Sequence, residues 1–299
     1  DEASQMTPAK AFGAIGRSKQ LIVVGDENQL PPTSFFQKAD NDIEEDLDMD
    51  VDESILDLAL GVWRNPRMLM WHYRSKHEDL IRFQNNFIYE SKLIIPPSTI
   101  GGESPDFGVM NHYLDEALYL QGGSNNDEAE KIVKLILEHA EKKPEKSIGV
   151  AVMNVSQRDL VKTKINQELS RNRKLGEFMD HWDSADEGLN KFFVKNLENV
   201  QGDERDVIIV GTVYGRNREG ERVMQRFPTI NTATGHRRLN VITTRARDQV
   251  HVVTSLRSSD IHERNNKGKD FLAGYLDYSI SKKIIEATSD SMGGTDSPF

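Results

Sequence analysis

The chain has 299 residues, of which 37% are hydrophobic and 29% are charged, so it is long enough to bury a substantial core. It contains no cysteine, which excludes disulfides and thiolate metal sites. No apolar run approaches the length of a membrane span, and no signal peptide opens the sequence. We therefore expect no membrane association and a cytoplasmic location.

The formal net charge of −10 argues against a nucleic-acid partner until its distribution is considered. Residues 40–53, "DNDIEEDLDMDVDE", contain nine acids and no Lys or Arg, so the rest of the chain is close to neutral. Basic residues are then free to dominate one face of the remainder. The acidic run is typical of a solvated or disordered loop. A regulatory role, in which it mimics nucleic acid, is the less favoured interpretation.

The sequence opens on "DEASQMTP", without an initial Met or a preceding strand, and we expect it to be a piece of a longer protein. The first predicted element is a buried parallel strand at 21–24, a short apolar run ending in Gly-Asp. A short helix is expected at 53–60, and another around 80–88, where apolar residues recur at helical spacing. Pro and Gly pairs near residues 96–102 then mark a loop.

The clearest predicted helix spans residues 125–142, because its apolar residues form one stripe. Ser124 or Asn125 can cap it, and Asp127 and Glu128 suit the positive end of its dipole. The elements expected after it are a strand at 147–154, a helix capped by Asn154 or Ser156, strands at 192–197 and 206–215, a helix at 237–248 and a strand at 249–256. This alternation predicts an α/β fold with a parallel sheet flanked by helices.

Ligands of open parallel sheets bind at the carboxyl ends of the strands, so the loops after the strands are the first places to look for a site. After the first predicted strand, Gln29 can both donate to a phosphate oxygen and accept from a water. A tight turn capped by Asp26 is an equally good interpretation. In a nucleotide site, one member of the Asp1–Glu2 pair can hold Mg²⁺, directly or through water, while the other orients the attacking water. Alone, such a pair at a chain start means little.

Two further segments carry polar groups suited to phosphate chemistry. In "WHYRSKHED", the planar fork of Arg74 suits a phosphate, although a solvated helix start is the simpler interpretation. His72 and His77 lack a third ligand, so no metal is expected there. In "NVQGDERD", Gly202 lets the backbone approach a ligand closely and Glu204 can accept from a ribose hydroxyl. A simple turn is the alternative.

The segment "HRRLNVITTRARD" is the most informative one, because a helix through it gives three faces with different tasks. Arg238 and Arg245 are seven residues apart and would share a face, so that the helix presents two arginines at one site. Asn240, Thr244 and Arg247 would share a second face, and Leu239, Ile242 and Ala246 would bury the third. Surface arginines would be the default for any one of these positions taken alone.

The ordered set "DEASQ", "GDENQLPP", "HYRS", "VQGDERD" and "RRLNVITTRAR" resembles motifs II to VI of superfamily 1 helicases. The most similar subgroup is that of senataxin and the nonsense-mediated-decay helicase, and the full pattern resembles large bacterial helicase-like proteins. Each motif is weak alone, but five in the right order are strong. The resemblance covers roughly residues 1–256 and implies a RecA-like P-loop NTPase fold.

The resemblance also implies roles for individual residues. Asp1 matches the Mg²⁺-coordinating carboxylate, Glu2 the catalytic carboxylate and Gln29 the γ-phosphate sensor. Arg74 and Arg245 match the two arginine fingers that stabilise charge on the transferred phosphoryl group. Gly202 and Glu204 match the nucleotide-contacting part of motif V. Arg238 has no catalytic counterpart and is interpreted as a salt-bridging or sensor-supporting residue.

One departure from the family is large, because the phosphate loop G-x-x-x-x-G-K-[ST] is absent from the sequence. The implied organisation is a remnant of the first RecA-like domain at 1–38, an acidic linker at 39–66, the second RecA-like domain at 67–286 and a flexible tail at 287–299. The implied parent is an ATP-dependent helicase or translocase that uses ATP and Mg²⁺ on single-stranded DNA or RNA, and it is expected to be a monomer that contains other domains. The alternatives are a non-catalytic nucleic-acid-binding or docking module, and a motor that remodels complexes without unwinding.

Overall fold

A computed structural model of the chain describes residues 1–32, 53–63, 65–98, 104–120, 122–218 and 220–284. The acidic run at 40–53, apart from Glu53, and the tail at 287–299 lie outside the described residues. No helix in the described ranges is both long and apolar enough to cross a membrane.

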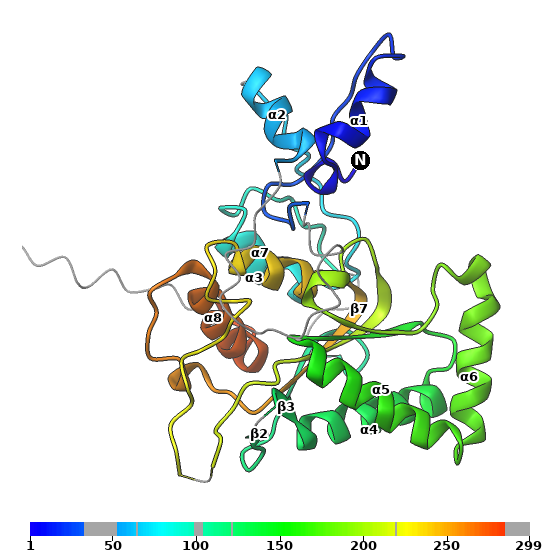
Figure 1. Cartoon of the computed structure of the whole chain (residues 1–299). Coiled ribbons are helices and arrows are strands. Elements are labelled where there is room, and N and C mark those ends of the chain that lie inside the picture. Colours follow the sequence, from blue (N-terminus) through cyan, green and yellow to red (C-terminus); the bar gives the residue numbers. More distant parts are fainter. Residues whose placement is uncertain (33–52, 64, 99–103, 121, 219, 285–299) are drawn as a thin grey trace, which may run out of the picture.

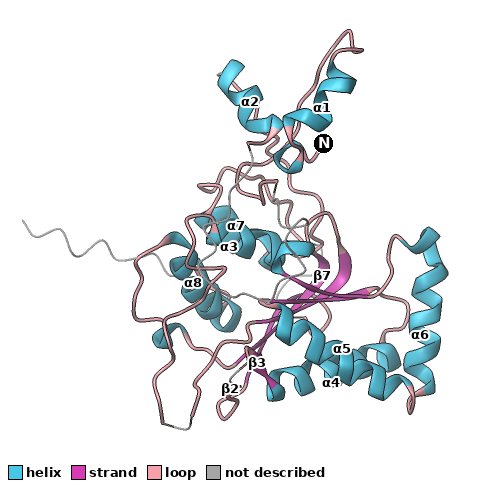
Figure 2. Ribbon diagram, in the orientation of Figure 1, coloured by secondary structure: helices cyan, strands magenta, loops and turns pink. Residues whose placement is uncertain are grey.

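The body is a parallel five-stranded sheet between two layers of helices, an α/β architecture (Figures 1 and 2). The strand order is β1-β7-β6-β4-β5, and every neighbouring pair is parallel. The strands are β1 (Gly108–Tyr113), β4 (Ile148–Val152), β5 (Phe193–Asn196), β6 (Arg205–Gly211) and β7 (Ala246–Thr254). The expected fold class, a parallel sheet flanked by helices, is confirmed.

One face of the sheet is covered by α4 (Asn126–Lys142) and α5 (Val155–Leu169), with α6 (Arg173–Ser184) beside them. The other face carries α3 (Asp79–Phe87), α7 (Gly235–Thr243) and α8 (Lys267–Ser281). The helix predicted at 125–142 is confirmed, since the Asn125 side chain accepts from Glu128 N, and Asn154 caps α5 in the same way through Gln157 N. A small antiparallel ribbon, β2 (Tyr119–Leu120) with β3 (Ser124–Asn125), precedes α4.

The first residues form a smaller unit above this body, with its own cluster of buried residues (Figure 1). It contains η1 (Ala3–Gln5), α1 (Pro8–Ile15) and α2 (Ile55–Val62), and α2 confirms the short helix expected at 53–60. Ala3, Ala11, Ile55 and Leu56 bury its centre, apart from the main core.

The strand predicted at 21–24 is wrong. These residues belong to no strand, and Ile22 is 74% exposed. The backbone bond from Ala3 N to Val24 O, at 3.0 Å, does not extend into a ladder. A buried strand needs neighbours on both sides to satisfy its peptide groups, and no strand lies beside this segment in the described ranges.

The helix predicted at 237–248 ends at Thr243, so that prediction is also wrong over its last residues. Thr243 and Thr244 donate their hydroxyls to the carbonyls four residues back, at 2.7 Å each. Arg245 Nε donates to Val241 O at 2.9 Å. These side-chain bonds satisfy carbonyls of the last turn, which lack further backbone donors where the helix ends. Ala246 and Arg247 lie instead in β7, where Ala246 pairs with Arg205.

Candidate functional site

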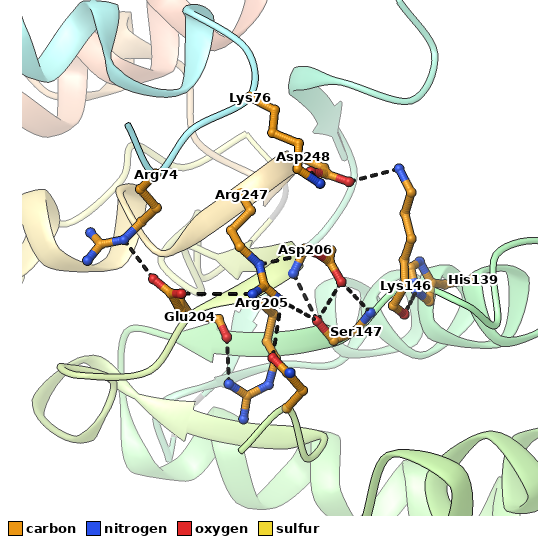
Figure 3. Close-up of polar contacts among 11 residues, drawn as sticks. Arg74, Lys76, His139, Lys146, Ser147, Glu204, Arg205, Asp206, Arg247 and Asp248 are labelled. Atoms are coloured by element: carbon orange, nitrogen blue, oxygen red, sulfur yellow. Dashed lines mark hydrogen bonds and ion pairs between the residues drawn. The ribbon is translucent and has the colours of Figure 1, made fainter. Parts of the chain in front are cut away.

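Three of the residues singled out after residue 66 lie at or near the amino ends of β6 and β7: Arg74, Glu204 and Arg245. Glu204 directly precedes β6 and Arg245 directly precedes β7, while Arg74 lies in the extended segment before α3. Figure 3 shows Arg74 and Glu204 pointing toward each other at this edge. The expectation that these residues would lie at the carboxyl ends of the strands is therefore wrong. Glu204 and Arg245 are the last residues of the connections that lead into β6 and β7. They therefore lie at the edge of the sheet where these parallel strands begin.

Arg245 is a buried cation, with only 2% of its surface exposed. Its Nε donates to Val241 O and its Nη2 donates to Thr244 Oγ1 at 3.2 Å. No carboxylate in the described part of the chain forms an ion pair with it. Burial lowers the pKa of Arg245 to about 10, and the charge of Arg74 adds to this shift. Arg245 is thus still protonated at neutral pH, and a buried charge without a counter-ion favours an anionic ligand.

Arg74 belongs to a line of charged residues along the sheet edge (Figure 3). Its Nε lies 2.8 Å from Glu204 Oε2, and no contact to a described residue involves Nη1 or Nη2. The other oxygen of Glu204 lies 3.9 Å from Arg247 Nη1, and Arg247 Nε lies 3.1 Å from Asp206 Oδ1. The pair of Arg74 and Glu204 therefore leaves both terminal nitrogens of Arg74 available to an oxygen ligand.

Asp206 is the last residue of this line, and it binds Ser147, which directly precedes the neighbouring strand β4. It accepts from Ser147 N at 2.9 Å and from Ser147 Oγ at 2.8 Å. Burial acts to raise the pKa of Asp206, but the hydrogen bonds from Ser147 and the charge of Arg247 outweigh it and leave the pKa lowered. Asp206 is thus a fixed anion that orients Arg247.

The residues of the first unit face the same place. Asp1 is exposed, and its carboxylate accepts from Glu2 N at 2.9 Å. Glu2 has a left-handed backbone, with φ 57°, and its charge acts on Arg245. Gln29 Nε2 donates to Asp26 Oδ2 at 3.2 Å, whereas Gln29 Oε1 is buried without a hydrogen-bond partner in the described ranges. That unpaired acceptor suits a donor such as a water.

Sequence reasoning missed three residues that join the two units. Gln201 Nε2 donates to Glu2 Oε2 at 2.9 Å. Tyr89 donates its hydroxyl to Asp26 Oδ2 at 2.8 Å, and burial raises the pKa of Tyr89. Asn240 Nδ2 donates to that hydroxyl at 2.9 Å and to Asn28 O at 3.0 Å. Partners so far apart along the chain leave no local signal, although Gln201 and Asn240 stand inside the motifs already noted.

Two residues of the motifs have other surroundings. Gly202 takes a φ of 82°, which favours glycine, and the space where a Cβ would stand is open, as the expected close approach of a ligand requires. Arg238 is buried and pairs through Nε with Glu198 Oε1 at 2.6 Å, so its interpretation as a salt-bridging residue is confirmed. The expectation that Arg238 and Arg245 share a helix face is wrong, because Arg245 lies beyond the helix end.

The residues present fit a phosphate-bearing ligand better than a metal held by protein groups alone. The unpaired charge of Arg245, the free end of Arg74 and the orphaned Gln29 Oε1 all suit phosphate oxygens and water. Within the described ranges, no group of three His, Asp or Glu side chains is arranged to hold a metal. Mg²⁺ in nucleotide sites takes one or two carboxylates together with phosphate oxygens, so Asp1 alone is compatible with it.

The fold and this edge define a parallel α/β protein with two converging arginines, and the comparisons add its family. Residues 51–257 match the family described as "AAA domain", and the chain belongs to that family. It is 31% identical over 288 residues to the uncharacterized ATP-dependent helicase MG140 homolog of Mycoplasma pneumoniae, covering 93% of this chain and 25% of that protein.

Two further relatives come from the subgroup that the motifs indicated. Helicase sen1 of Schizosaccharomyces pombe is 22% identical, covering 90% of this chain and 15% of that protein. Regulator of nonsense transcripts 1 of Dictyostelium discoideum is 26% identical, covering 83% of this chain and 17% of that protein. The resemblance to superfamily 1 helicases is confirmed. The chain spans a quarter or less of the length of these relatives.

Proposed function

We propose that the chain acts as part of an ATP-dependent helicase or translocase, in which the edge of β6 and β7 supplies one half of the nucleotide site. The observation that carries the proposal is Arg245, a buried cation that has no carboxylate partner in the described ranges and whose pKa is lowered further by the charge of Arg74. A buried cation without a counter-ion, together with the terminal nitrogens of Arg74 that Glu204 leaves available, favours a ligand with several negative oxygens. The ATP-dependent helicases among the relatives give that ligand its identity.

Each of the proposed site residues has its own role in ATP hydrolysis. Arg74 and Arg245 bind the oxygens of the terminal phosphate and stabilise negative charge there as it develops. Glu2 orients the attacking water and accepts its proton, with Gln29 Oε1 as a second acceptor for that water. Asp1 holds Mg²⁺, directly or through water, and this ion supplies charge neutralisation when bound. Gly202 and the adjacent backbone contact the nucleotide.

Single-stranded DNA or RNA is the proposed track of the motor. Its contacts would be mainly to phosphates, with some stacking of bases, so binding would have weak sequence preference and strong salt dependence. ATP would draw the units on either side of the nucleotide together and engage Arg74 and Arg245. Release after hydrolysis would complete one step along the strand.

The test is Arg245→Ala in a longer protein that carries this chain together with a phosphate loop. We expect ATP turnover to fall by about 10³-fold, the scale of a lost arginine finger, while nucleotide binding is largely kept. The matched control is Arg173→Ala on α6, whose side chain is 91% exposed and pairs only with Glu177. Near-normal turnover of the Arg245→Ala variant would refute the proposal.

A binding or docking module without catalysis is the second candidate, and it is favoured for residues 1–299 alone by the lack of a phosphate-loop motif in the sequence. We expect no appreciable ATP hydrolysis from this chain by itself. Hydrolysis stimulated by single strands in the purified chain would exclude the second candidate.

A further inference from the structure

Gln201 uses both ends of its side-chain amide to join two distant parts of the first unit. Its Nε2 donates to Glu2 Oε2 at 2.9 Å, and its Oε1 accepts from Leu30 N at 3.0 Å. The two contacts span 199 and 171 residues of sequence. A single amide therefore ties the loop before β6 to the segment of Glu2 and to the segment of Gln29.

The backbone around Gln201 is itself fixed. Val200, on one side, is fully buried in the main core. Gly202, on the other side, adopts a positive φ of 82° that turns the chain toward β6. Because Val200 is buried and Gly202 forms a turn, the backbone between them fixes the direction in which the Gln201 side chain points. Leu30, whose backbone N–H donates to Gln201, is 2% exposed and also belongs to the main core.

The other end of the contact is equally specific. Glu2 adopts a left-handed backbone that is uncommon for a residue other than glycine, Asn or Asp. Gln201 is the only described side chain that donates to the Glu2 carboxylate. A hydrogen bond from a neutral donor fixes one carboxylate oxygen and leaves the other able to accept a proton.

We propose that Gln201 is a positioning residue, which sets the Glu2 carboxylate and the Gln29–Leu30 backbone as one unit against Arg245. This inference rests on the proposed function for its catalytic meaning, but the coupling itself is a property of the chain. An amide suits the task because it donates to a carboxylate and accepts from a backbone N–H at once. Neither an alanine nor a carboxylate does both.

The test compares Gln201→Ala with Gln225→Ala in the purified 299-residue chain by amide hydrogen exchange. Gln225 is a matched control, because its amide also bridges distant segments: it donates to Asp260 O and accepts from His262 N. We expect the Leu30 amide to exchange about five- to tenfold faster in Gln201→Ala, from the loss of one hydrogen bond. Gln225→Ala should leave Leu30 unchanged. Equal exchange at Leu30 in all three proteins would overturn the proposal.

A second variant separates positioning from mere space filling. Gln201→Glu keeps an acceptor for Leu30 N but places a like charge against Glu2, which raises the pKa of one of the two carboxyls. We expect this variant to melt below the parent chain at pH 8 and to recover as the pH falls and the pair takes up a proton. The deficit of Gln201→Ala relative to the parent should stay constant over that range.

The same pH dependence in both variants would count against a hydrogen bond to Glu2. These readings need no catalysis, so they stand or fall independently of the proposed function. If Arg245→Ala leaves ATP turnover intact while Leu30 exchange responds to Gln201, the coupling holds and the helicase role fails.

Discussion

At the scale of single residues, the pairing of Arg74 with Glu204 changes the meaning of both. The sequence assigned Glu204 to a ribose hydroxyl, and that assignment stays a prediction. In the structure both oxygens of Glu204 face arginines, Arg74 at 2.8 Å and Arg247 at 3.9 Å. Because the contact uses Arg74 Nε, Glu204 orients the guanidinium without occupying its terminal nitrogens. Glu204 is thus suited to aim Arg74 at a phosphate.

Substituting Glu204→Gln tests this orienting role. The two side chains are 35% and 42% exposed, so their ion pair is worth at most about 1 kcal/mol of stability. We expect the free energy of unfolding to change by less than that, while ATP turnover in the longer protein falls roughly tenfold or more through misplacement of Arg74. Denaturant unfolding and turnover are measured on the same samples.

Glu177→Gln is the matched control, because Glu177 also meets an arginine Nε, that of Arg173, at 2.7 Å on the exposed surface of α6. Its turnover should equal that of the parent. A Glu204→Gln variant with full turnover would show that Arg74 needs no such partner.

At the scale of elements, the sequence correctly predicted features that depend only on residues within the same segment. The stripe on α4 and the asparagine caps of α4 and α5 depend on neighbours a few residues away, and both appear as expected. The strand at 21–24 failed because strand formation depends on a partner that the local pattern cannot supply. The helix after residue 237 ended early because Ala246 and the residues after it pair with β6 in the sheet, a contact that the local pattern does not contain.

The candidate site shows the same contrast between what a local pattern predicts and what only the fold determines. Arg74, Arg245 and Glu204 were singled out because motifs carry them in a fixed order. The structure brings them to one edge, and their roles stay predictions. Gln201, Tyr89 and Asn240 were not assigned roles, since their partners in these contacts lie 63 to 212 residues away. Local spacing encodes chemistry on one segment, whereas contacts between segments follow only from the fold.

The start of α4 carries a buried carboxylate that holds the ends of two strands. Glu128 is 0% exposed, and it accepts from Val213 N at 2.7 Å and from Ser255 N at 2.8 Å. The Ser255 hydroxyl donates to the same carboxylate. Val213, at the end of β6, has a φ of 69°, a strained value for a β-branched residue. Burial raises the pKa of Glu128 to about 7 against the opposing effect of these donors.

Replacing Glu128 with Gln should destabilise the chain by about 1–3 kcal/mol, because the new NH₂ group faces a backbone donor that is left unsatisfied. Glu130→Gln, on the exposed side of the same helix, should change stability by no more than about 0.5 kcal/mol. Urea unfolding of both variants at pH 8 decides the matter. Since the folded pKa of Glu128 lies above its unfolded value, the proton-linked part of its contribution is largest below pH 4.5 and is lost as the pH rises through about 7. Measurement at pH 8 therefore tests the hydrogen bonds of the ionised carboxylate without that part.

At the scale of the whole molecule, histidines that are partly or fully buried predict sensitivity to acid. Burial lowers the pKa of His112 to about 4 and that of His251 to about 3. The two rings stack on β1 and β7, and their nitrogens lie 2.9 Å apart. The charges of Lys131, at both rings, and of Lys143, at His251, lower these pKa values further, whereas Glu138 acts to raise that of His112. Burial likewise lowers the pKa of His72 and of His236 to about 4.

In each case the folded state binds a proton less readily than the unfolded chain, whose histidines titrate near 6.5. The stability that these groups contribute is present above pH 6.5 and is lost as the pH falls toward 4. We therefore expect the melting temperature to fall by several degrees between pH 7 and pH 5, at about 2–4 °C for each kcal/mol lost.

The double substitution His112→Gln with His251→Gln should flatten this fall, because it removes two of the groups that must stay neutral. The exposed His262→Gln variant serves as the control and should follow the parent curve. If the double variant and the parent lose the same number of degrees, the acid sensitivity arises from other groups, and the stacked pair across β1 and β7 has no part in it.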